Sequence, residues 1–482
     1  MRDFFRPVAT LLTGTVLAQV LIYASRPVLT RLFTPDEFGV LSFYTGVIAV
    51  IASLSGGKFE DALMLPRDPQ RAWSLAAASI LLSCLAAVVL GALSVFRHVL
   101  QPLLSNPEAA RFLILAPLSV VFVGVARTSD AWLTRTQHFV EVARGRVAHS
   151  AALVPAQLAG GIGKVGAVGL VGGLLLGQAT QSIYYGLRAI AAARSESLSI
   201  PSLRSIFDAA WRYRRFALFG APGTALNTAS VQLPALVLLF FFDASVLGNY
   251  GVGYAVLAVP MTLLGSAVAQ VFYVRAAEAI RTGQVTDLTE SVFRRLVALG
   301  LFPILCVSIS GPELFRFVFG SSWSDAGLYA SYLSPWVFLV FISSPLSRLF
   351  DLLEKQKELL LFNVLLFVVR GSALLAGGKS DDAKIAILLF GVAGALMWLL
   401  HTGWTLHLAA VRAWRAGAIL GRYLAFAAAP FSIVVVSKLL DSDLWASAGV
   451  VLAGAIYYLV LLRSDPELLN VILDRPSNEA EN

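Results

Sequence analysis

The sequence predicts an all-α integral membrane protein with about fourteen transmembrane helices. Hydrophobic residues make up 57% of the 482 residues, charged residues only 14%, and the mean hydropathy is +0.76. A soluble protein carries about 25% charged residues, so this composition excludes an ordinary soluble domain. Apolar stretches such as residues 73–96 and 385–408 are long enough to cross the hydrocarbon core as helices, and they lack the alternation of barrel strands.

Fourteen spans follow from these apolar stretches. The predicted spans cover residues 8–29, 40–57, 73–96, 111–134, 147–162, 164–187, 216–241, 245–272, 296–315, 327–350, 359–377, 385–406, 418–437 and 445–462. The fifth and sixth are separated only by residues 160–164, so a count of twelve stays open. The first span has no small-residue cleavage site after it, and it is interpreted as a membrane helix rather than a signal peptide.

The distribution of positive charge predicts that both termini are cytoplasmic. With the N-terminus inside, 26 Lys and Arg residues fall in cytoplasmic segments and 8 in segments on the other side. Positive residues favour the cytoplasmic side of short loops. The same rule accounts for the net charge of +8 without a nucleic-acid partner. The two cysteines, Cys84 and Cys306, lie in predicted spans, and their spacing indicates no disulfide framework or metal site.

Short motifs recur along the chain and predict an internal repeat. The matched pairs are Phe33 with Phe242, Gly39 with Gly248, Pro117 with Pro335, and Gln137 with Gln356, at offsets of 209 to 219 residues. The two copies begin six spans apart on the same side, so they are parallel repeats about an axis along the membrane normal. Chance matching between apolar segments is the alternative.

The repeat predicts the domain organisation. Residues 1–190 form an N-lobe with spans one to six, and residues 191–215 form a cytoplasmic linker. Residues 216–411 form a C-lobe with spans seven to twelve. Residues 412–462 add two further spans, and residues 463–482 form a cytoplasmic tail.

Two six-helix repeats followed by two C-terminal helices resemble the layout of the multidrug/oligosaccharidyl-lipid/polysaccharide exporter superfamily. Local motifs narrow the resemblance to Wzx-type polysaccharide flippases: LFTPDEFG at residues 32–39, FYVRAAE at 272–278 and FVFGSSWSDAG at 317–327. The resemblance covers most of the chain, but these motifs mark structure more than chemistry. It implies a transporter, not an enzyme, that lies in the bacterial inner (cytoplasmic) membrane and has no catalytic residues.

The resemblance also implies a substrate and its surroundings. The expected function is to move an undecaprenyl-diphosphate-linked oligosaccharide from the cytoplasmic to the periplasmic leaflet by alternating access. This lipid-linked oligosaccharide would serve surface polysaccharide biosynthesis, for example of O-antigen, lipopolysaccharide or exopolysaccharide. Membrane lipids and polysaccharide assembly proteins are the expected partners of a monomer. No cofactor is expected, and the coupling of transport to a proton or a sodium ion is left open.

Three other functions are alternatives. A lipid II flippase of the same superfamily is a near neighbour. A multidrug exporter would favour intramembrane carboxylates for its cations. Here the one clear intramembrane carboxylate, Asp130, is outnumbered by three intramembrane arginines. A membrane O-antigen polymerase or ligase is expected to carry a sizeable periplasmic loop. The predicted periplasmic loops are only about 15 residues long or shorter, which favours a transporter.

Three intramembrane arginines are the candidate ligands for a diphosphate and sugar. Their planar guanidinium groups bind phosphate oxygens in pairs, and a charge within a span is costly unless it serves a function. Arg370 lies near mid-span, Arg26 in the periplasmic half of the polar first span, and Arg127 in the fourth span. Helix-packing contacts for Arg370, and a guanidinium that reaches the interface for Arg26, are the structural alternatives.

Five further residues are candidates for gating or coupling. Asp130 lies three residues after Arg127, a spacing that permits an intrahelical pair which substrate or a coupling ion would open. The others are Lys58, Glu60 and Asp61, at the cytoplasmic end of the second span, and Arg348, at the end of the tenth. A solvated loop is the alternative for the first three. The spacing of the histidines does not predict a metal site.

Overall fold

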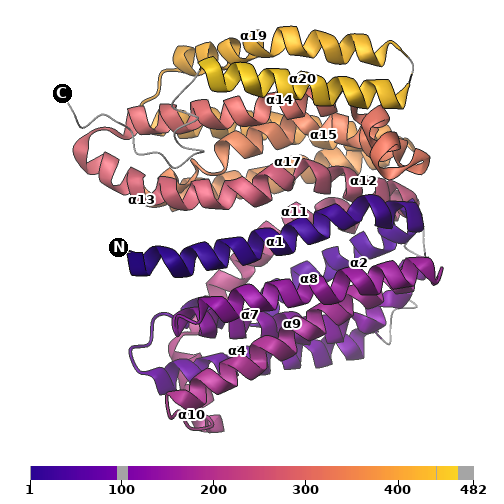
Figure 1. Ribbon diagram of the computed structural model, residues 1–482. Coiled ribbons are helices and arrows are strands. Elements are labelled where there is room, and N and C mark those ends of the chain that lie inside the picture. Colours follow the sequence, from indigo (N-terminus) through magenta and orange to yellow (C-terminus); the bar gives the residue numbers. More distant parts are fainter. Residues whose placement is uncertain (1, 95–106, 441, 465–482) are drawn as a thin grey trace. The chain divides into compact units, whose positions relative to one another are not determined.

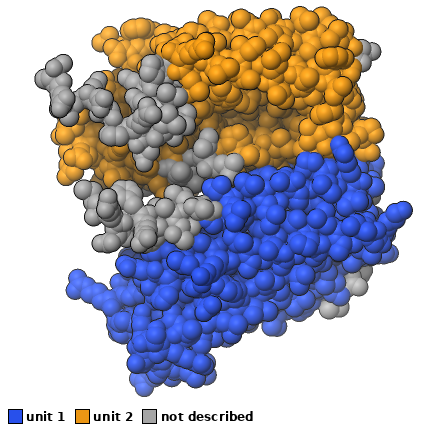
Figure 2. Space-filling view, in the orientation of Figure 1, with its two compact units in different colours: residues 1–251 blue, residues 252–482 orange. Residues whose placement is uncertain are grey.

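The computed structural model describes residues 2–94, 107–440 and 442–464. Within these ranges every regular element is a helix, which confirms the predicted all-α fold. The predicted tail lies outside the described residues from residue 465 onwards. The chain forms two units, residues 1–251 and residues 252–482, which Figure 2 shows in different colours.

Unit 1 is built from long helices joined by short ones (Figure 1). Its elements are α1 (Arg2–Leu32), α2 (Pro35–Ser55), α3 (Phe59–Ala62), α4 (Pro69–Ser94), α6 (Pro107–Arg111), η2 (Phe112–Leu115), α7 (Ala116–Arg135), α8 (Phe139–Ile162), α9 (Ala167–Ser195), α10 (Leu203–Arg212), η3 (Phe216–Gly220) and α11 (Ala221–Phe241). Helix α8 packs against α1 and α9, α7 packs against α4 and α9, and α2 packs against α11. The predicted linker, residues 191–215, contains α10, which packs on α4.

Unit 2 begins within a helix that starts in unit 1. The remaining elements are α12 (Ala244–Leu257), η4 (Met261–Gly265), α13 (Ser266–Thr282), α14 (Val285–Phe319), η5 (Ser321–Trp323), α15 (Ser324–Ser343), α16 (Arg348–Leu352), α17 (Gln356–Gly378), α18 (Ala383–Leu408), α19 (Ala413–Lys438) and α20 (Asp443–Ser464). Helix α15 packs against α14 and α18, and α19 and α20 pack against each other and against α14. The two C-terminal helices therefore belong to the core of unit 2.

Ten helical segments among the described residues are long and apolar enough to cross a membrane. They confirm a multi-pass membrane protein. Each of the fourteen predicted spans coincides with a helical segment, but the segments at α1, α8, α9 and α12–α13 are not among these ten. The fifth and sixth predicted spans are separate helices, because the chain turns at Lys164 and Gly166 with φ of +52° and +67°. The count of fourteen spans and the orientation remain predictions.

Large apolar side chains on the outer faces of several helices support the membrane assignment. Val88 on α4, Leu400 on α18 and Val451 on α20 are 69%, 66% and 73% exposed. A soluble monomer rarely exposes extended apolar surface, whereas lipid tails are as apolar as these side chains. These residues are the expected lipid contacts of their helices.

The boundary between α1 and α2 explains one of the sequence motifs. Thr34 caps α2, since its hydroxyl accepts a hydrogen bond from the backbone N–H of Glu37 at 3.4 Å. The Glu37 carboxylate in turn accepts one from the Thr34 backbone N–H at 2.7 Å. Pro35 occupies the first turn, where its missing N–H costs nothing. This capping box ends α1 and fixes the start of α2.

The first turns of α2 and α12, both in unit 1, touch without intervening side chains. A Cβ atom added to Gly39 would lie 1.9 Å from the carbonyl oxygen of Ala244, and one added to Gly248 would lie 1.8 Å from that of Pro35. At an offset of 209 residues, Ala244 is the repeat equivalent of Pro35, and Gly248 that of Gly39. The contact is therefore reciprocal, as expected for equivalent elements about a local two-fold axis. It supports the predicted repeat at this position.

Candidate functional site

Predicted site residues gather around the C-terminal end of α2 in unit 1. The chain leaves α2 through a turn in which Lys58 adopts a left-handed φ of +57°, and Lys58 forms an ion pair with Asp61 at 2.9 Å. Glu60 is buried, and its carboxylate accepts a hydrogen bond from the Ser79 hydroxyl of α4 at 3.3 Å. Ser79 also contacts the hydroxyl of Thr128 on α7 at 2.9 Å. Glu60 is thus part of the helix packing, not of a solvated loop.

Arg127 reaches the same end of α2 from α7. Its Nη1 donates a hydrogen bond to the carbonyl oxygen of Ala52 at 3.0 Å. Ala52 is one of the last four residues of α2, whose carbonyls lack partners within a regular helix and carry partial negative charge. The residue as a whole is exposed. Arg127 therefore stabilises the end of α2 from an exposed position.

The structure pairs Asp130 with Arg146 of α8 instead of with Arg127. The carboxylate of Asp130 lies 3.6 Å from Nη2 of Arg146 and accepts a hydrogen bond from Thr134 at 3.4 Å. Arg146 also donates to the hydroxyl of Thr15 on α1. The side chains of Asp130 and Arg146 are 32% and 33% exposed, so this pair is not sealed in the core. We call the group of Thr15, Asp130, Thr134 and Arg146 the unit 1 polar cluster.

Arg146 was missed from the sequence because the fifth span was predicted to begin at residue 147. The helix begins eight residues earlier, at Phe139, and places Arg146 two turns inside it. A local signal was available: Glu141 and Arg144 stand three residues apart, and they form an ion pair at 3.0 Å on the surface of the helix. Such a pair is typical of helical spacing.

Arg26 lies apart from these residues, near the end of α1. It is half-buried, and its guanidinium lies 5.7 Å from the centre of the Tyr23 ring one turn earlier. The backbone carbonyl of Arg26 accepts a hydrogen bond from Thr30 at 3.0 Å. The intrahelical contact with Tyr23 is what the structure adds to the prediction for Arg26.

Arg370 lies in unit 2, on α17. Its guanidinium sits 4.1 Å from the ring centres of both Trp336 on α15 and Phe390 on α18. The residue is 3% exposed. The contacts with two aromatic rings and the low exposure favour the helix-packing interpretation of Arg370. Arg348, in the same unit, forms a surface ion pair with Asp351 at 3.4 Å.

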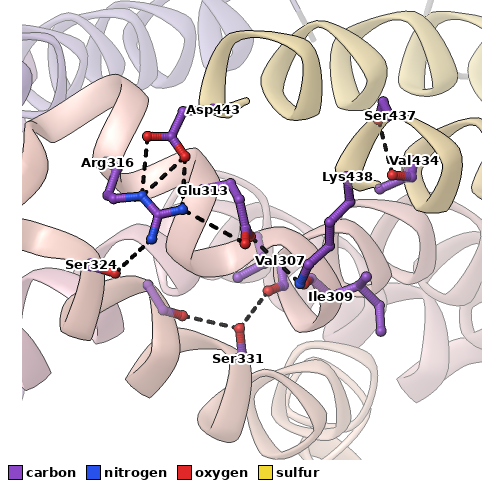
Figure 3. Close-up of polar contacts among 11 residues, drawn as sticks. Val307, Ile309, Glu313, Arg316, Ser324, Ser331, Val434, Ser437, Lys438 and Asp443 are labelled. Carbon is purple, nitrogen blue, oxygen red and sulfur yellow. Dashed lines mark hydrogen bonds and ion pairs between the residues drawn. The ribbon is translucent and has the colours of Figure 1, made fainter. Parts of the chain in front are cut away.

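A second charged group in unit 2 was not predicted. Arg316 on α14 donates through Nε and Nη2 to the carboxylate of Asp443 on α20, at 2.8 to 3.1 Å, and through Nη1 to Ser324 at 3.1 Å (Figure 3). Glu313 lies 3.8 Å from Arg316 and 3.6 Å from Lys438 on α19. The sequence placed Arg316 and Lys438 in loops. The structure shows instead that they join the ends of four helices.

This charged group adjoins a kink in α14. Ser310 has non-helical backbone angles of −112° and 21°, and Pro312 follows it. A proline removes one backbone hydrogen bond from a helix, so nearby carbonyl groups need other donors. Lys438 donates to the carbonyl of Ile309, and Ser331 donates to that of Val307 at 2.8 Å (Figure 3). The kink is thus held by side chains from α15 and α19.

Unit 2 also contains a cavity of about 540 Å³ where α13 meets the start of α14. It is lined by Arg275, Glu278, Ala279, Thr282, Gln284, Asp287 and Leu288. None of the predicted site residues that the structure describes lines this cavity. Across the described part of the chain, no three His, Cys, Asp or Glu side chains are placed to hold a metal ion.

Comparison with known proteins places the chain in a family. A family described as "Polysaccharide biosynthesis protein" matches residues 28–327. The succinoglycan biosynthesis transport protein ExoT of Rhizobium meliloti (strain 1021) is 23% identical over 477 residues, which cover 94% of this chain and 91% of that protein. These matches confirm the resemblance drawn from the sequence motifs.

Solved structures share the fold. The lipid II flippase MurJ, in an inward closed conformation, matches with a TM-score of 0.70 and 11% identity over 94% of this chain and all of that chain. A multidrug resistance MATE family transporter of the MOP superfamily, in an inward-facing conformation, matches with a TM-score of 0.65 and 13% identity over 82% and 95% of the two chains. Identities this low show a common fold and nothing finer. With its family match over more than half of its length and this fold, the chain belongs to the polysaccharide biosynthesis protein family.

Proposed function

We propose that this chain is a flippase that moves an undecaprenyl-diphosphate-linked oligosaccharide from the cytoplasmic to the periplasmic leaflet of the bacterial inner membrane. Transport proceeds by alternating access and supplies surface polysaccharide biosynthesis. The observation that carries the proposal is the family match, together with a fold that matches a lipid II flippase over 94% of the chain. A curated relative named as a transport protein of succinoglycan biosynthesis adds support.

Arg127 and the unit 1 polar cluster together suit a diphosphate. A flippase has to carry a charged, hydrated head group past hydrocarbon while the lipid tail stays in the bilayer. Arg127 and Arg146 bring two positive charges to α7 and α8, and Asp130 brings one negative charge. Charges inside membrane helices are costly, so the presence of two arginines here is more consistent with an anionic ligand than with packing alone. Arginine also bonds phosphate oxygens in pairs.

The pair of Asp130 and Arg146 is the candidate element for gating or coupling. At 3.6 Å and about one-third exposed, it is loose enough for a phosphate or a cation to compete for either partner. A phosphate would take Arg146, while a proton or sodium ion would take Asp130. Either event separates α7 from α8 at this position, and α8 also contacts α1 through Thr15. Transport coupled to a proton or a sodium ion would use the second of these events.

Reconstitution tests the proposed function. Purified protein is placed in liposomes with a fluorescent short-chain polyprenyl-diphosphate oligosaccharide, and the fluorophore that becomes accessible to an added quencher is measured over time. We expect faster exposure of the glycan than in protein-free liposomes. Parallel samples with lipid II and with a cationic dye distinguish the lipid II flippase and the multidrug exporter. Transport of the dye alone would overturn the proposal.

Variants then test the polar cluster in the same assay. Arg146→Gln removes the cation and leaves Asp130 without its ion-pair partner. Hydrogen bonds to charged groups contribute about 1.5–3 kcal/mol, so we expect flipping to slow by about tenfold or more. Arg144→Gln is the matched control, because Arg144 lies on the same helix, is 62% exposed and forms an ion pair with Glu141 outside the cluster. Equal rates for both variants would exclude a role for the cluster.

A further inference from the structure

The helix α10, in the segment predicted to be a linker, carries an apolar face that the described residues leave exposed. Leu203, Phe207 and Trp211 are 79%, 65% and 59% exposed, and Ile200 just before the helix is 94% exposed. The rings of Phe207 and Trp211 stack at a centre-to-centre distance of 6.0 Å. At spacings of three and four residues these side chains form one continuous stripe.

The other two faces of α10 have different partners. Ile206, Ala209 and Ala210 pack into a cluster of buried residues from α3 and α4, with Ala209 2% exposed. Arg204, Asp208 and Arg212 are exposed on a third face. Arg214 lies over the Trp211 ring at 4.6 Å and donates to its backbone carbonyl at 2.9 Å. The helix therefore has a packed face, an exposed apolar face and an exposed charged face.

Two sets of hydrogen bonds fix α10 beside the first turns of α4. Gln70 exchanges two hydrogen bonds with the backbone of Ser199, both at 3.0 Å, and Ser74 contacts Ser205 at 3.3 Å. Helix α4 has 26 residues and is one of the candidate spans. Its length is about 39 Å, which exceeds the hydrocarbon core of about 30 Å, so the end turns of α4 reach the boundary of a bilayer that it crosses. Figure 1 shows α10 beside this end of α4.

The charge around the apolar stripe identifies its partner. Between residues 200 and 216 the chain carries four exposed arginines, Arg204, Arg212, Arg214 and Arg215, and one acidic residue, Asp208. A short amphipathic helix with aromatic residues on one face and arginines beside them lies in the plane of a membrane interface. Arginines at that depth attract acidic lipid head groups.

We propose that α10 is an interfacial anchor whose aromatic stripe enters the acyl region while Arg204, Arg212 and Arg215 bind acidic phospholipid head groups of the same leaflet. The packed face prevents the helix from rolling, so the stripe keeps one orientation toward the lipid. Arg214 is assigned to Trp211, which it stacks on and holds in place. This role is independent of which substrate the protein moves.

Spin labels test whether the aromatic stripe enters the acyl region. The variants Phe207→Cys and Asp208→Cys are made in full-length protein in which Cys84 and Cys306 are replaced, and each is labelled at its new cysteine. Both are reconstituted in phosphatidylcholine vesicles with about 30% phosphatidylglycerol. This charged fraction gives a negative surface potential. We expect the label at 207 to be accessible to oxygen and shielded from a water-soluble nickel complex, and the label at 208 to show the opposite. Equal access of the nickel complex to both labels would overturn the proposal, and a protein partner would then be the alternative.

Charge variants test whether the three arginines bind acidic head groups. With the label at 207, changing Arg204, Arg212 and Arg215 together to Gln should lower the inserted fraction in phosphatidylglycerol vesicles toward its value in pure phosphatidylcholine. Each arginine should contribute about fivefold to the ratio of inserted to free helix at low salt. The matched control changes the same three residues to Lys and should behave as the parent protein. Loss of insertion in the Lys variant, or identical insertion in both kinds of vesicle, would exclude binding through charge.

Discussion

The contact between the first turns of α2 and α12 predicts a large effect from a small substitution. Gly39→Ala adds one methyl group 1.9 Å from the Ala244 carbonyl oxygen, whereas ordinary van der Waals contacts of Cβ atoms are 3.4–4 Å. The neighbouring atom is backbone, so the two helices have to separate by more than about 1 Å. Overpacking of this kind costs about 1–3 kcal/mol, which changes the folding equilibrium by about 5-fold to 150-fold.

Reversible unfolding by sodium dodecyl sulfate in mixed micelles measures this change. Gly172→Ala is the matched control, since a Cβ atom at Gly172 of α9 meets nothing within 4 Å. We expect Gly39→Ala and Gly248→Ala to unfold at lower detergent fractions and Gly172→Ala to unfold like the parent protein. The double variant at positions 39 and 248 should lose less than the sum, because both methyl groups open the same contact. Unchanged unfolding of Gly39→Ala would refute the close approach of the two helices.

Three further predictions concern arginine contacts. Asp443→Asn weakens the paired hydrogen bonds to Arg316 and should lower the free energy of unfolding by about 1–2 kcal/mol, with a smaller loss at high salt, in the same unfolding assay. Arg127→Gln removes the cation from the end of α2. It should lower the free energy of unfolding by less than about 1 kcal/mol, since the residue is exposed. A large fall in the flipping rate with so small a loss of stability would indicate that Arg127 binds the substrate. Arg370→Lys keeps the charge but loses the guanidinium contacts with the Trp336 and Phe390 rings. It should therefore insert normally and unfold more easily, by about 1–2 kcal/mol; parent-like stability would contradict the packing role.

The positions of the helices could be predicted from the sequence because apolar length is set by the bilayer. Their ends could not, since an apolar stretch marks the hydrocarbon while the backbone hydrogen bonds of a helix continue beyond it. Helix α14 begins at Val285, eleven residues before the predicted span, and α8 begins at Phe139, eight residues before. Because of the second difference, Arg146 was not predicted as a site residue.

Partners distant in the sequence explain what else was missed. Residue type and depth identified Arg370 as buried, but the rings that flank it come from α15 and α18. The spacing of Arg127 and Asp130 permits a local pair, yet α8 supplies a competing arginine. Helical spacing gives possible contacts within one helix, whereas the choice among partners depends on the packing of several helices.

The ion pair of Arg316 and Asp443 also has a consequence for the order in which the protein is made. Its two residues are 127 positions apart, so Arg316 leaves the ribosome roughly 6–25 s before Asp443 at about 5–20 residues per second. During that interval Glu313 and Ser324 are the nearby groups that can hold the guanidinium. Once α20 has been made, Asp443 becomes the remaining partner of Arg316. A chain that stops before residue 443 would therefore insert most of its helices yet leave the end of α14 poorly held, and cellular quality control would have a local defect by which to recognise it.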